Sequence, residues 1–441
     1  MEFFIPKDSN GVKFKYAFNL GRVFTLSLAE LFAVFENIGL NFRLVDLYRE
    51  VLIIETEDKL DVLKLQKSVG GTIKIMQVLD SVGRKKALSP SLVLKDYFDA
   101  KMLKDQYLAG YTGKIQIGIS YYPLAEVRDL PIRGDNKRIG FKIKEILTTA
   151  GYSVRLVLPQ LAGLALPSVV VTNEHLLEKG AEIDFLVGLE RVYLAKTITV
   201  QNFEDYGRRD YQRPARDMQV GMLPPKVAQM MINLAQLPVT SAGNLKHAIL
   251  DPFAGSGTVI QEALIMGHKG IGSDISPKAV ENAEKNLEWI KNRYKLPPGR
   301  FELFVADAKK LSENLPKIEI DAVVTEATLG PAYGTAPKPQ EIERNFKELE
   351  DIYVGAFESF KKFLSPGKRV VVALPAYRTE KGYVYFPGID KLAKTGYDIV
   401  DPLPEIVVEK YPFLQITARK SLVYDRKDQF VSREIFIFKS T

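Results

Sequence analysis

The stretch Asp251-Pro-Phe-Ala-Gly-Ser-Gly-Thr258 constrains the fold of this 441-residue chain more than any other. An apolar run precedes it and apolar residues at helical spacing follow it, so the sequence predicts a strand, a glycine turn and a helix start. Gly255 and Gly257 leave the backbone bare at that helix start, where free N–H groups favour a carboxylate or a phosphate. The stretch therefore predicts the first turn of a doubly wound α/β domain, with a ligand beside it.

Two further strands are predicted to end in an acidic residue. The first ends in Gly272-Ser-Asp274, about twenty residues after the glycine turn, where a carboxylate can accept hydrogen bonds from both hydroxyls of a ribose. The second covers Phe301 to Val305 and is followed by Asp307, whose carboxylate can meet the amino group of an adenine. Three successive strands that each end in Asp indicate a nucleotide-like ligand more strongly than any one of them.

The segment from Asp251 to Thr258 resembles the first motif of class I S-adenosylmethionine-dependent methyltransferases that methylate amino groups. In that family the glycine turn faces the methionine part of the cofactor, and the acids after the second and third strands contact ribose and adenine. The resemblance implies these roles for the turn, for Asp274 and for Asp307. The residues expected at S-adenosyl-L-methionine are Pro224, Asp251, Phe253, Ala254, Gly255, Gly257, Thr258, Asp274, Ile275, Asp307 and Ala308. A tight first turn without a ligand is the alternative.

The rest of the C-terminal half, residues 227–441, alternates predicted helices and strands. The alternation favours a mostly parallel sheet with helices on both faces. A long helix is expected over Gln340–Leu364, and Leu422–Tyr424 and Glu434–Phe438 are expected to pair as a hairpin with an antiparallel edge strand. The predicted fold class is α/β, with a Rossmann-like class I methyltransferase domain at the C-terminus.

The N-terminal region is expected to form α+β domains. Residues 1–83 follow the order strand, helix, strand, strand, helix, strand, which is the pattern of a ferredoxin-like domain. The polar and basic stretch that follows, with Arg84-Lys85-Lys86, is interpreted as a solvated connection between domains.

Residues 84–200 resemble the THUMP domain, an RNA-binding module found beside tRNA-modifying enzymes. The resemblance rests on Val169-Val-Val-Thr-Asn173, on the segment that ends at Gly180, and on Lys196-Thr197. In that family this surface receives the acceptor end of tRNA, although a purely structural β/α domain is the alternative. The RNA-binding candidates here are Arg155, Asn173, Lys179 and Lys196.

A charged linker, residues 201–226, connects this region to the methyltransferase domain. Its arginines, with Arg208 and Arg213 as candidates, could grip phosphates, and its tyrosines could stack on bases. They could equally pair with the aspartates of the linker itself. The end of the linker, Pro224-Pro-Lys226, resembles the element that closes over the cofactor in these methyltransferases.

Together these resemblances cover nearly the whole chain and point to the tRNA guanosine N2-methyltransferase family. That family places Asp-Pro-Pro-Tyr after the fourth strand, so that a carboxylate and a carbonyl hold the amine and an aromatic ring stacks on the base. Here the stretch is Glu326-Ala-Thr-Leu-Gly330. The catalytic candidates are Glu326, Thr328, which keeps a carbonyl, and Tyr333, which could supply the missing ring. Two alternatives stay open: a non-catalytic relative that binds cofactor or RNA, and an amino-methyltransferase acting on adenine N6 in another nucleic acid.

Composition narrows the class further. The chain has no cysteine, which excludes thiolate zinc sites and the cysteine nucleophile that methylation at carbon 5 of a pyrimidine requires. A net charge of +7 permits tRNA as a partner. No apolar run reaches the roughly 18 residues that span a bilayer, and no signal peptide is recognised, so a cytoplasmic protein is expected. We also expect it to be a monomer. Its three histidines show no metal-ligand spacing. The resemblance leaves open a small activator protein on the methyltransferase domain.

Overall fold

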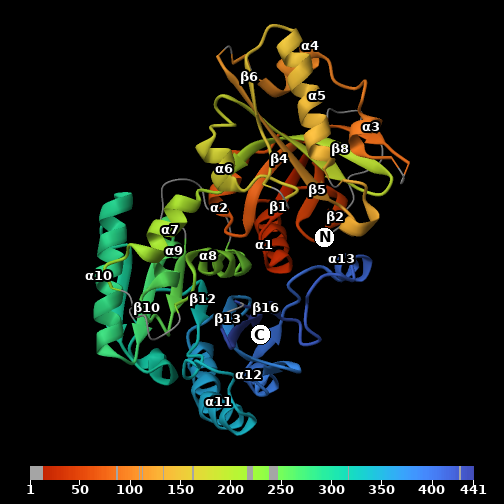
Figure 1. Cartoon of the computed structure of the whole chain (residues 1–441). Coiled ribbons are helices and arrows are strands. Elements are labelled where there is room, and N and C mark those ends of the chain that lie inside the picture. The colour runs from red at the N-terminus through yellow and green to blue at the C-terminus, as the bar shows by residue number, and fades with distance from the viewer. Residues whose placement is uncertain are drawn as a thin grey trace. The chain divides into compact units, whose positions relative to one another are not determined.

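The computed structural model describes residues 13–85, 88–108, 110–111, 113–132, 134–160, 163–215, 222–237, 247–315, 317–426 and 429–441. The chain divides into two compact units, coloured along the chain in Figure 1. Unit 1 takes its described residues from Met1–Phe24, Leu40–Ser68 and Thr72–Phe203, and unit 2 from Thr25–Gly39, Val69–Gly71 and Glu204–Thr441. An N-terminal helix and a glycine pair therefore group with the C-terminal half.

Unit 1 is built on one eight-stranded sheet. Its strands are β1 (Phe14–Leu20), β2 (Phe42–Tyr48), β3 (Val51–Thr56), β4 (Thr72–Gly83), β5 (Ile115–Pro123), β6 (Val154–Val157), β7 (Gly180–Val187) and β8 (Arg191–Val200). The strand order is β2-β3-β1-β4-β8-β7-β5-β6. The first four strands pair antiparallel, and β5 runs parallel to both of its neighbours. Because β4 pairs with β8, the sheet continues across residue 83, the predicted domain boundary.

The helices of unit 1 are short, except for one. They are α2 (Val62–Ser68), α3 (Pro90–Val93), α4 (Ala100–Met102), η1 (Leu103–Leu108), η2 (Val127–Asp129), α5 (Asp135–Thr149) and α6 (Ser168–Asn173). Helix α5 buries Ile139, Ile143 and Leu147, one turn apart, against the sheet. The predicted order of strands and helices over residues 13–83 is observed, with α1 (Phe24–Asn37) as its first helix.

The segment predicted to be a solvated connection is packed in part. Lys85 is exposed, as predicted, and Lys86 lies outside the described residues. Arg84 is buried, and its guanidinium donates to the carbonyls of Gly188 at 2.9 Å and Leu88 at 2.6 Å. Leu103 and Tyr107 enter the same core as β5 and β7. The basic sequence predicted exposure. An arginine can nevertheless be buried where its guanidinium donates to several carbonyl groups, as Arg84 does here.

A buried polar cluster lies within the unit 1 sheet. Lys74 donates to Glu182 at 2.6 Å and to the carbonyl of Leu166 at 2.7 Å, with both members of the ion pair at or below 1% exposure. Glu182 also accepts from the hydroxyls of Ser120 and Thr197. Burial raises the pKa of the neighbouring Asp184 carboxyl well above its usual range, and the charge of Glu182 adds to the effect.

Unit 2 is built on a mixed sheet of nine strands. They are β9 (Ala248–Asp251), β10 (Lys269–Asp274), β11 (Phe301–Val305), β12 (Ala322–Glu326), β13 (Arg369–Thr379), β14 (Gly382–Tyr385), β15 (Tyr397–Ile399), β16 (Leu422–Tyr424) and β17 (Val431–Ser440). The order is β11-β10-β9-β12-β13-β17-β15, with β14 on β13 and β16 on β17. Strands β9 to β13 run parallel.

The predictions for this sheet are confirmed in part. The pairing of β16 with β17 is observed, and the predicted parallel arrangement holds for β9 to β13, whereas every pairing of β14 to β17 is antiparallel. The antiparallel strand was expected at an edge, but β17 lies between β13 and β15 and pairs antiparallel with both. Its residues are almost all buried, which a strand in the interior of a sheet requires.

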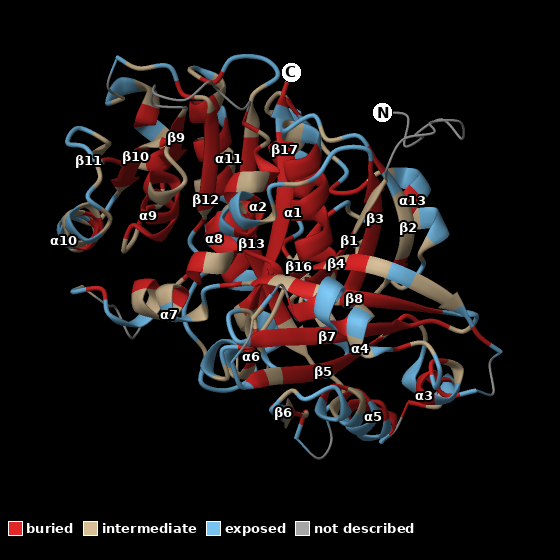
Figure 2. Cartoon of the chain, turned by 90° about the horizontal axis from the view of Figure 1, so that it is seen from above, coloured by how far each residue is buried: buried red, intermediate tan, exposed pale blue. Residues whose placement is uncertain are grey.

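Helices cover both faces of this sheet. The helices between residues 203 and 441 are α7 (Phe203–Tyr211), α8 (Pro225–Leu234), α9 (Thr258–Ile265), α10 (Pro277–Tyr294), η3 (Ala308–Glu313), α11 (Pro339–Lys361), α12 (Ile389–Lys394) and α13 (Glu405–Lys410). Apolar residues of α9 and α10 form one cluster, and those of α11 and α12 form another with the opposite side of the strands. Figure 2 shows the central strands in the colour of buried residues. Among the helices that the structure describes, none has the length and apolarity needed to cross a membrane.

Helix α1 is fixed within unit 2 by a buried carboxylate. Glu30 is fully buried and accepts hydrogen bonds from the backbone N–H groups of Gly70 and Gly71 and from the side-chain amide of Asn233, each at 2.7 Å. Burial raises the pKa of Glu30 to about 7, against the lowering effect of these three donors. A side chain at position 71 would meet Ser27 and Met230 at less than 3.0 Å, so this close approach requires glycine.

Candidate active site

The candidate site lies at one edge of the unit 2 sheet. Strands β9, β10 and β12 run parallel, so Asp251, Asp274 and Glu326 end at the same edge. The strand order reverses between β9 and β12, because β10 and β11 follow on one side and β12 and β13 on the other. Open α/β sheets bind their ligands outside the carboxyl ends of the strands at such a reversal.

The glycine turn has the backbone conformation that its sequence predicts. Gly255 has φ +50° and Gly257 has φ +80°, in the left-handed region that favours glycine. A Cβ atom at position 257 would lie 3.2 Å from that of Ala283 on α10. The turn is therefore restricted to small residues both by its own conformation and by the helix packed behind it.

Asp274 holds this turn in place. Its two carboxylate oxygens accept hydrogen bonds from the backbone N–H of Gly255 at 3.0 Å and from that of Ser276 at 2.9 Å. Each oxygen keeps a second lone pair for another donor. Asp274, which is predicted to contact a ribose, is thus half-exposed at the sheet edge. The glycine turn already fixes the orientation of its carboxylate.

Asp251 has a different role from that of a surface ligand group. It is buried, and it accepts hydrogen bonds from the hydroxyl of Thr325 at 2.6 Å and from the backbone N–H of Phe253 at 3.2 Å. Burial raises its pKa to about 7, against the lowering effect of these two donors. Asp251 therefore links the ends of β9 and β12, the two strands that flank the reversal.

The carboxyl end of β11 completes the edge. Asp307 caps η3 by accepting from the backbone N–H of Lys309 at 2.9 Å, and Ala308 is buried behind it. Val305 is 50% exposed and pairs in register with Asp274 on β10. Ile275, which follows Asp274, is 70% exposed. Two exposed apolar side chains beside these acids suit the face of a flat ring. The residues present therefore fit a nucleoside.

Three further predicted cofactor residues, Pro224, Phe253 and Ala254, are buried or half-buried. Pro224 precedes α8 and its carbonyl accepts from the backbone N–H groups of Val227 and Ala228. Ala254 is buried and donates its N–H to the carbonyl of Ser273, which ties the glycine turn to β10. Phe253 is half-buried and packs against the cluster that contains α11.

Glu326, the candidate for holding the amine, forms an ion pair that the sequence analysis did not anticipate. Arg433 on β17 donates from its Nε to Glu326 Oε1, and the side chains are 3% and 17% exposed. The predicted strand began at Glu434, one residue too late to include this arginine. The adjacent charges Arg433 and Glu434, directly before the apolar run Ile435 to Phe438, were the one indication in the sequence.

The loop after β12 is held by aromatic hydroxyl groups. Tyr353 donates to the carbonyl of Thr328, so the backbone oxygen predicted to accept the amine already has one partner. Tyr377 donates to the carbonyl of Leu329 at 3.1 Å. The ring of Tyr333 packs edge-to-face on Tyr377 with centroids 5.9 Å apart, and its hydroxyl accepts from Asn345. Tyr333 is half-exposed, as a stacking residue must be.

The linker arginines occupy different environments. Arg208 is 42% exposed and pairs with Glu204 at 3.0 Å. Arg213 is fully buried and donates to Thr258 Oγ1 at 2.7 Å and to Ser256 Oγ at 3.2 Å. A guanidinium committed to the glycine turn in this way anchors the linker instead of reaching a phosphate, which is a different role from the predicted one. The sequence could not distinguish the two arginines because burial depends on the tertiary fold.

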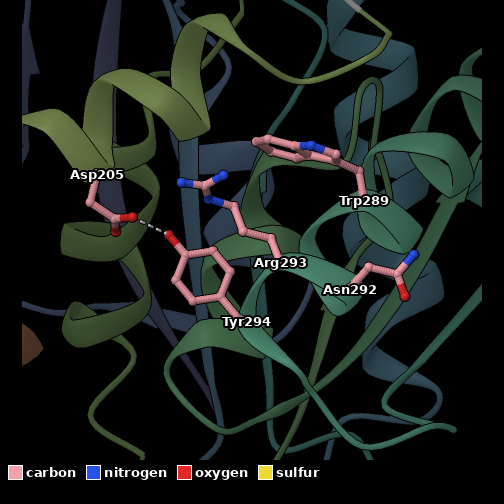
Figure 3. Close-up of a pocket in the computed structure, with 5 residues that line it drawn as sticks. All are labelled: Asp205, Trp289, Asn292, Arg293 and Tyr294. Carbon is pink, nitrogen blue, oxygen red and sulfur yellow. Dashed lines mark hydrogen bonds between the residues drawn. The ribbon is translucent and has the colours of Figure 1, made fainter.

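A hollow of about 590 Å³ lies between the linker helix α7 and the end of α10 (Figure 3). It is lined by Asp205, Trp289, Asn292, Arg293 and Tyr294. Tyr294 donates to Asp205 at 2.6 Å, and the Arg293 guanidinium lies 5.8 Å from the Trp289 ring centroid. Helix α10 begins after the carboxyl end of β10, and its last turn leads back to the start of β11. The hollow lies at that last turn, so it is away from the edge that carries the candidate site.

The predicted RNA-binding residues of unit 1 divide into two groups. Arg155, Asn173 and Lys179 are exposed, and Arg155 pairs with Glu174 at 3.0 Å. The strand register places Arg155 and Gly180, the residue after Lys179, on either side of Gln116, so these cations lie close together. Lys196 is half-buried and donates to the carbonyl of Tyr107, and burial lowers its pKa.

No group of three or more metal-ligating side chains is found among the residues that the structure describes.

Comparison with known proteins gives partial matches in sequence. A family model described as DNA methylase matches residues 187–285. Two tRNA (guanine(10)-N2)-dimethyltransferases are similar: that of Pyrococcus abyssi is 31% identical over 171 residues, and that of Methanothermobacter thermautotrophicus is 30% identical over 189 residues. These matches cover 38% and 43% of this chain, and 42% and 48% of the relatives. The chain thus spans less than half the length of the curated relatives it matches.

Comparison with solved structures covers nearly the whole chain. The crystal structure of TrmN from Thermus thermophilus aligns with a TM-score of 0.54 at 16% identity, over 98% of this chain and all of that one. At this level of identity the likeness concerns the fold alone. Together with the strand order β11-β10-β9-β12-β13-β17-β15, it identifies a mixed α/β protein whose second unit has the Rossmann-like fold of the class I methyltransferases.

Proposed function

We propose that this protein transfers a methyl group from S-adenosyl-L-methionine to the exocyclic N2 amine of a guanosine in tRNA. The observation that carries the proposal is the shared edge of the unit 2 sheet, where the glycine turn, Asp274 and Glu326 meet at the strand reversal. The names of the similar relatives supply the substrate class, and the net charge of +7 suits a polyanionic partner.

The cofactor would be held by the residues that shape this edge. The N–H groups of the glycine turn would face its methionine carboxylate, Asp274 would accept from its ribose, and Asp307 would meet its adenine amino group. Ile275 and Val305 would cover the adenine faces. When bound, the cofactor supplies an electrophilic methyl group on a sulfonium sulfur.

Glu326 would orient the amine. The lone pair of the exocyclic nitrogen is delocalised into the base, so the site must hold both N–H bonds and direct the lone pair. A carboxylate oxygen of Glu326 and the carbonyl of Thr328 can each accept one of these hydrogens, since a carbonyl oxygen with one donor keeps a second lone pair. Tyr333 would stack on the extruded base.

Unit 1 would supply most of the tRNA contacts. Arg155 and Lys179 are exposed at one end of β5 to β7, and together with the exposed Asn173 of α6 they would contact phosphates or the 3′ end. We assign them to a THUMP-like domain over residues 84–200, beside a ferredoxin-like part over 1–83, a linker over 201–226 and the methyltransferase domain over 227–441. We propose that the protein acts on tRNA in the cytoplasm and that the monomer is the active form.

A second candidate function is adenine N6 methylation of another nucleic acid, favoured by the DNA methylase description of the family model. A third is binding without catalysis, favoured by Ala327 and Leu329 where the family has proline and tyrosine.

One transfer assay separates these functions. We would incubate the protein with tritium-labelled cofactor and an unmodified tRNA transcript, a transcript in which inosine replaces guanosine, or a DNA duplex. Inosine lacks the N2 amine but keeps the rest of the base. We expect label only on the guanosine transcript. Label on inosine RNA, or label recovered on adenine from the DNA, would support an adenine substrate, and cofactor binding without any transfer would support the non-catalytic function.

A further inference from the structure

We propose that Arg433 is a positioning residue that fixes the Glu326 carboxylate for the amine of the substrate. This inference rests on the proposed function and adds a residue to it that the motif after β12 does not contain. It explains how a glutamate could act where the resemblance implies an aspartate.

The pairing is well placed for this role. Glu326 is the last residue of β12, and Arg433 lies on β17, with β13 between them in the sheet. Arg433 is 3% exposed, so its guanidinium is desolvated and its hydrogen bond to Glu326 is strong. The backbone of β17 pairs with β13 over nine residues, which gives the arginine a rigid base.

The pairing leaves one carboxylate oxygen for the substrate. Arg433 Nε donates to Oε1 of Glu326, and no other side-chain hydrogen bond to Glu326 is found among the described residues. Glu326 keeps 17% of its side chain exposed at the edge where the strands end. Oε2 can therefore accept a hydrogen from an amine while Oε1 is held from behind.

Glutamate needs such a restraint more than aspartate does. Its side chain has one more rotatable bond, and ordering that bond costs conformational entropy unless another contact has already done so. A misplacement of about 1 Å can cost about 10²-fold in rate, because the lone pair and the reacting methyl must be aligned. An arginine that fixes Oε1 removes that freedom before substrate binds.

The test compares Arg433→Lys and Glu326→Asp with the wild type in methyl transfer to tRNA. Lysine keeps the charge but has no Nε–H at this position, so we expect kcat to fall by about 10-fold to 100-fold. The KM values for cofactor and tRNA should change less than about threefold. Glu326→Asp should also lower kcat, because the shorter arm cannot reach Arg433 and the amine together. The double variant should be no worse than the poorer single one, as expected for residues that act as a unit.

Arg419→Lys is the matched control. Arg419 lies 3.4 Å from Glu434, the next residue of β17, whose carboxylate is fully buried. This variant disturbs an ion pair of the neighbouring residue, whose side chain lies on the other face of the same strand, so it should lower the midpoint of thermal unfolding while leaving kcat within about twofold.

Several results would overturn the inference. They are wild-type kcat in Arg433→Lys, full activity in Glu326→Asp, additive losses in the double variant, or an equal loss of kcat in Arg419→Lys. An effect of Arg433→Lys on KM alone would make it a substrate-binding residue instead. Absence of transfer by the wild type would overturn the proposed function itself, and with it this inference.

Discussion

Replacing Asp274 by asparagine should weaken cofactor binding and loosen the glycine turn at the same time. The carboxylate accepts from the N–H of Gly255 through one oxygen and from that of Ser276 through the other, at 3.0 and 2.9 Å. Asparagine has a single acceptor oxygen, so its NH₂ group would face one of these N–H groups. A lost hydrogen bond to a charged group costs about 1.5–3 kcal/mol.

The same range applies to the ribose contact. A loss of about 1.5–3 kcal/mol corresponds to a decrease of about 10-fold to 100-fold or slightly more in affinity, since about 1.4 kcal/mol is a factor of ten. Isothermal titration calorimetry with S-adenosyl-L-methionine would measure it, and thermal unfolding without cofactor would measure the effect on the turn separately.

Asp307→Asn is the control for this substitution. Among the described residues, the one hydrogen bond to the Asp307 side chain comes from the N–H of Lys309, and asparagine caps a helix as well as aspartate does. This variant should therefore retain its thermal stability, whereas Asp274→Asn should not. Unchanged cofactor affinity in Asp274→Asn would refute the assignment of this edge as the cofactor site.

Three further predictions concern stability and RNA. Lys74→Met leaves the buried carboxylate of Glu182 unpaired and should lower the free energy of unfolding by about 3–5 kcal/mol, measured by urea denaturation; a loss below 1 kcal/mol would contradict this reasoning. The folded-state pKa of Glu30 is raised to about 7, so its protonated form adds stability below about pH 4.5 that is lost as pH rises towards 7. Glu30→Gln should flatten this dependence between pH 5 and 7, and an unchanged slope would show that Glu30 does not titrate there. Arg155→Ala with Lys179→Ala should weaken tRNA binding at low salt and reduce the slope of log affinity against log salt by about 1–2, and an unchanged slope would place the RNA elsewhere.

Much of unit 2 could be predicted from local sequence. The glycine turn, the strand ends at Asp274 and Asp307, and the alternation of helix and strand each depend on residues close together in the chain. The interior position of β17 could not be predicted, because a strand's place in a sheet depends on partners far away in sequence. Arg433 was missed for the same reason, since 107 residues separate it from Glu326.

Charged residues were the least predictable. Arg84 and Arg213 are buried by carbonyl and hydroxyl partners, whereas Arg208, in the same kind of basic stretch as Arg213, is exposed. Arginine side chains are mostly exposed in proteins. Whether enough acceptors surround a given arginine to allow its burial depends on the tertiary fold. The pairing of Glu30 with Gly70 and Gly71 likewise joins segments about forty residues apart.

The most direct test of the account is mass spectrometry of nucleosides from tRNA incubated with the protein and S-adenosylmethionine that carries a deuterated methyl group. The account predicts a labelled methyl or dimethyl group on N2 of guanosine, lost in Glu326→Gln. Label on adenosine, or no label in any nucleoside although the protein binds the cofactor, would contradict it.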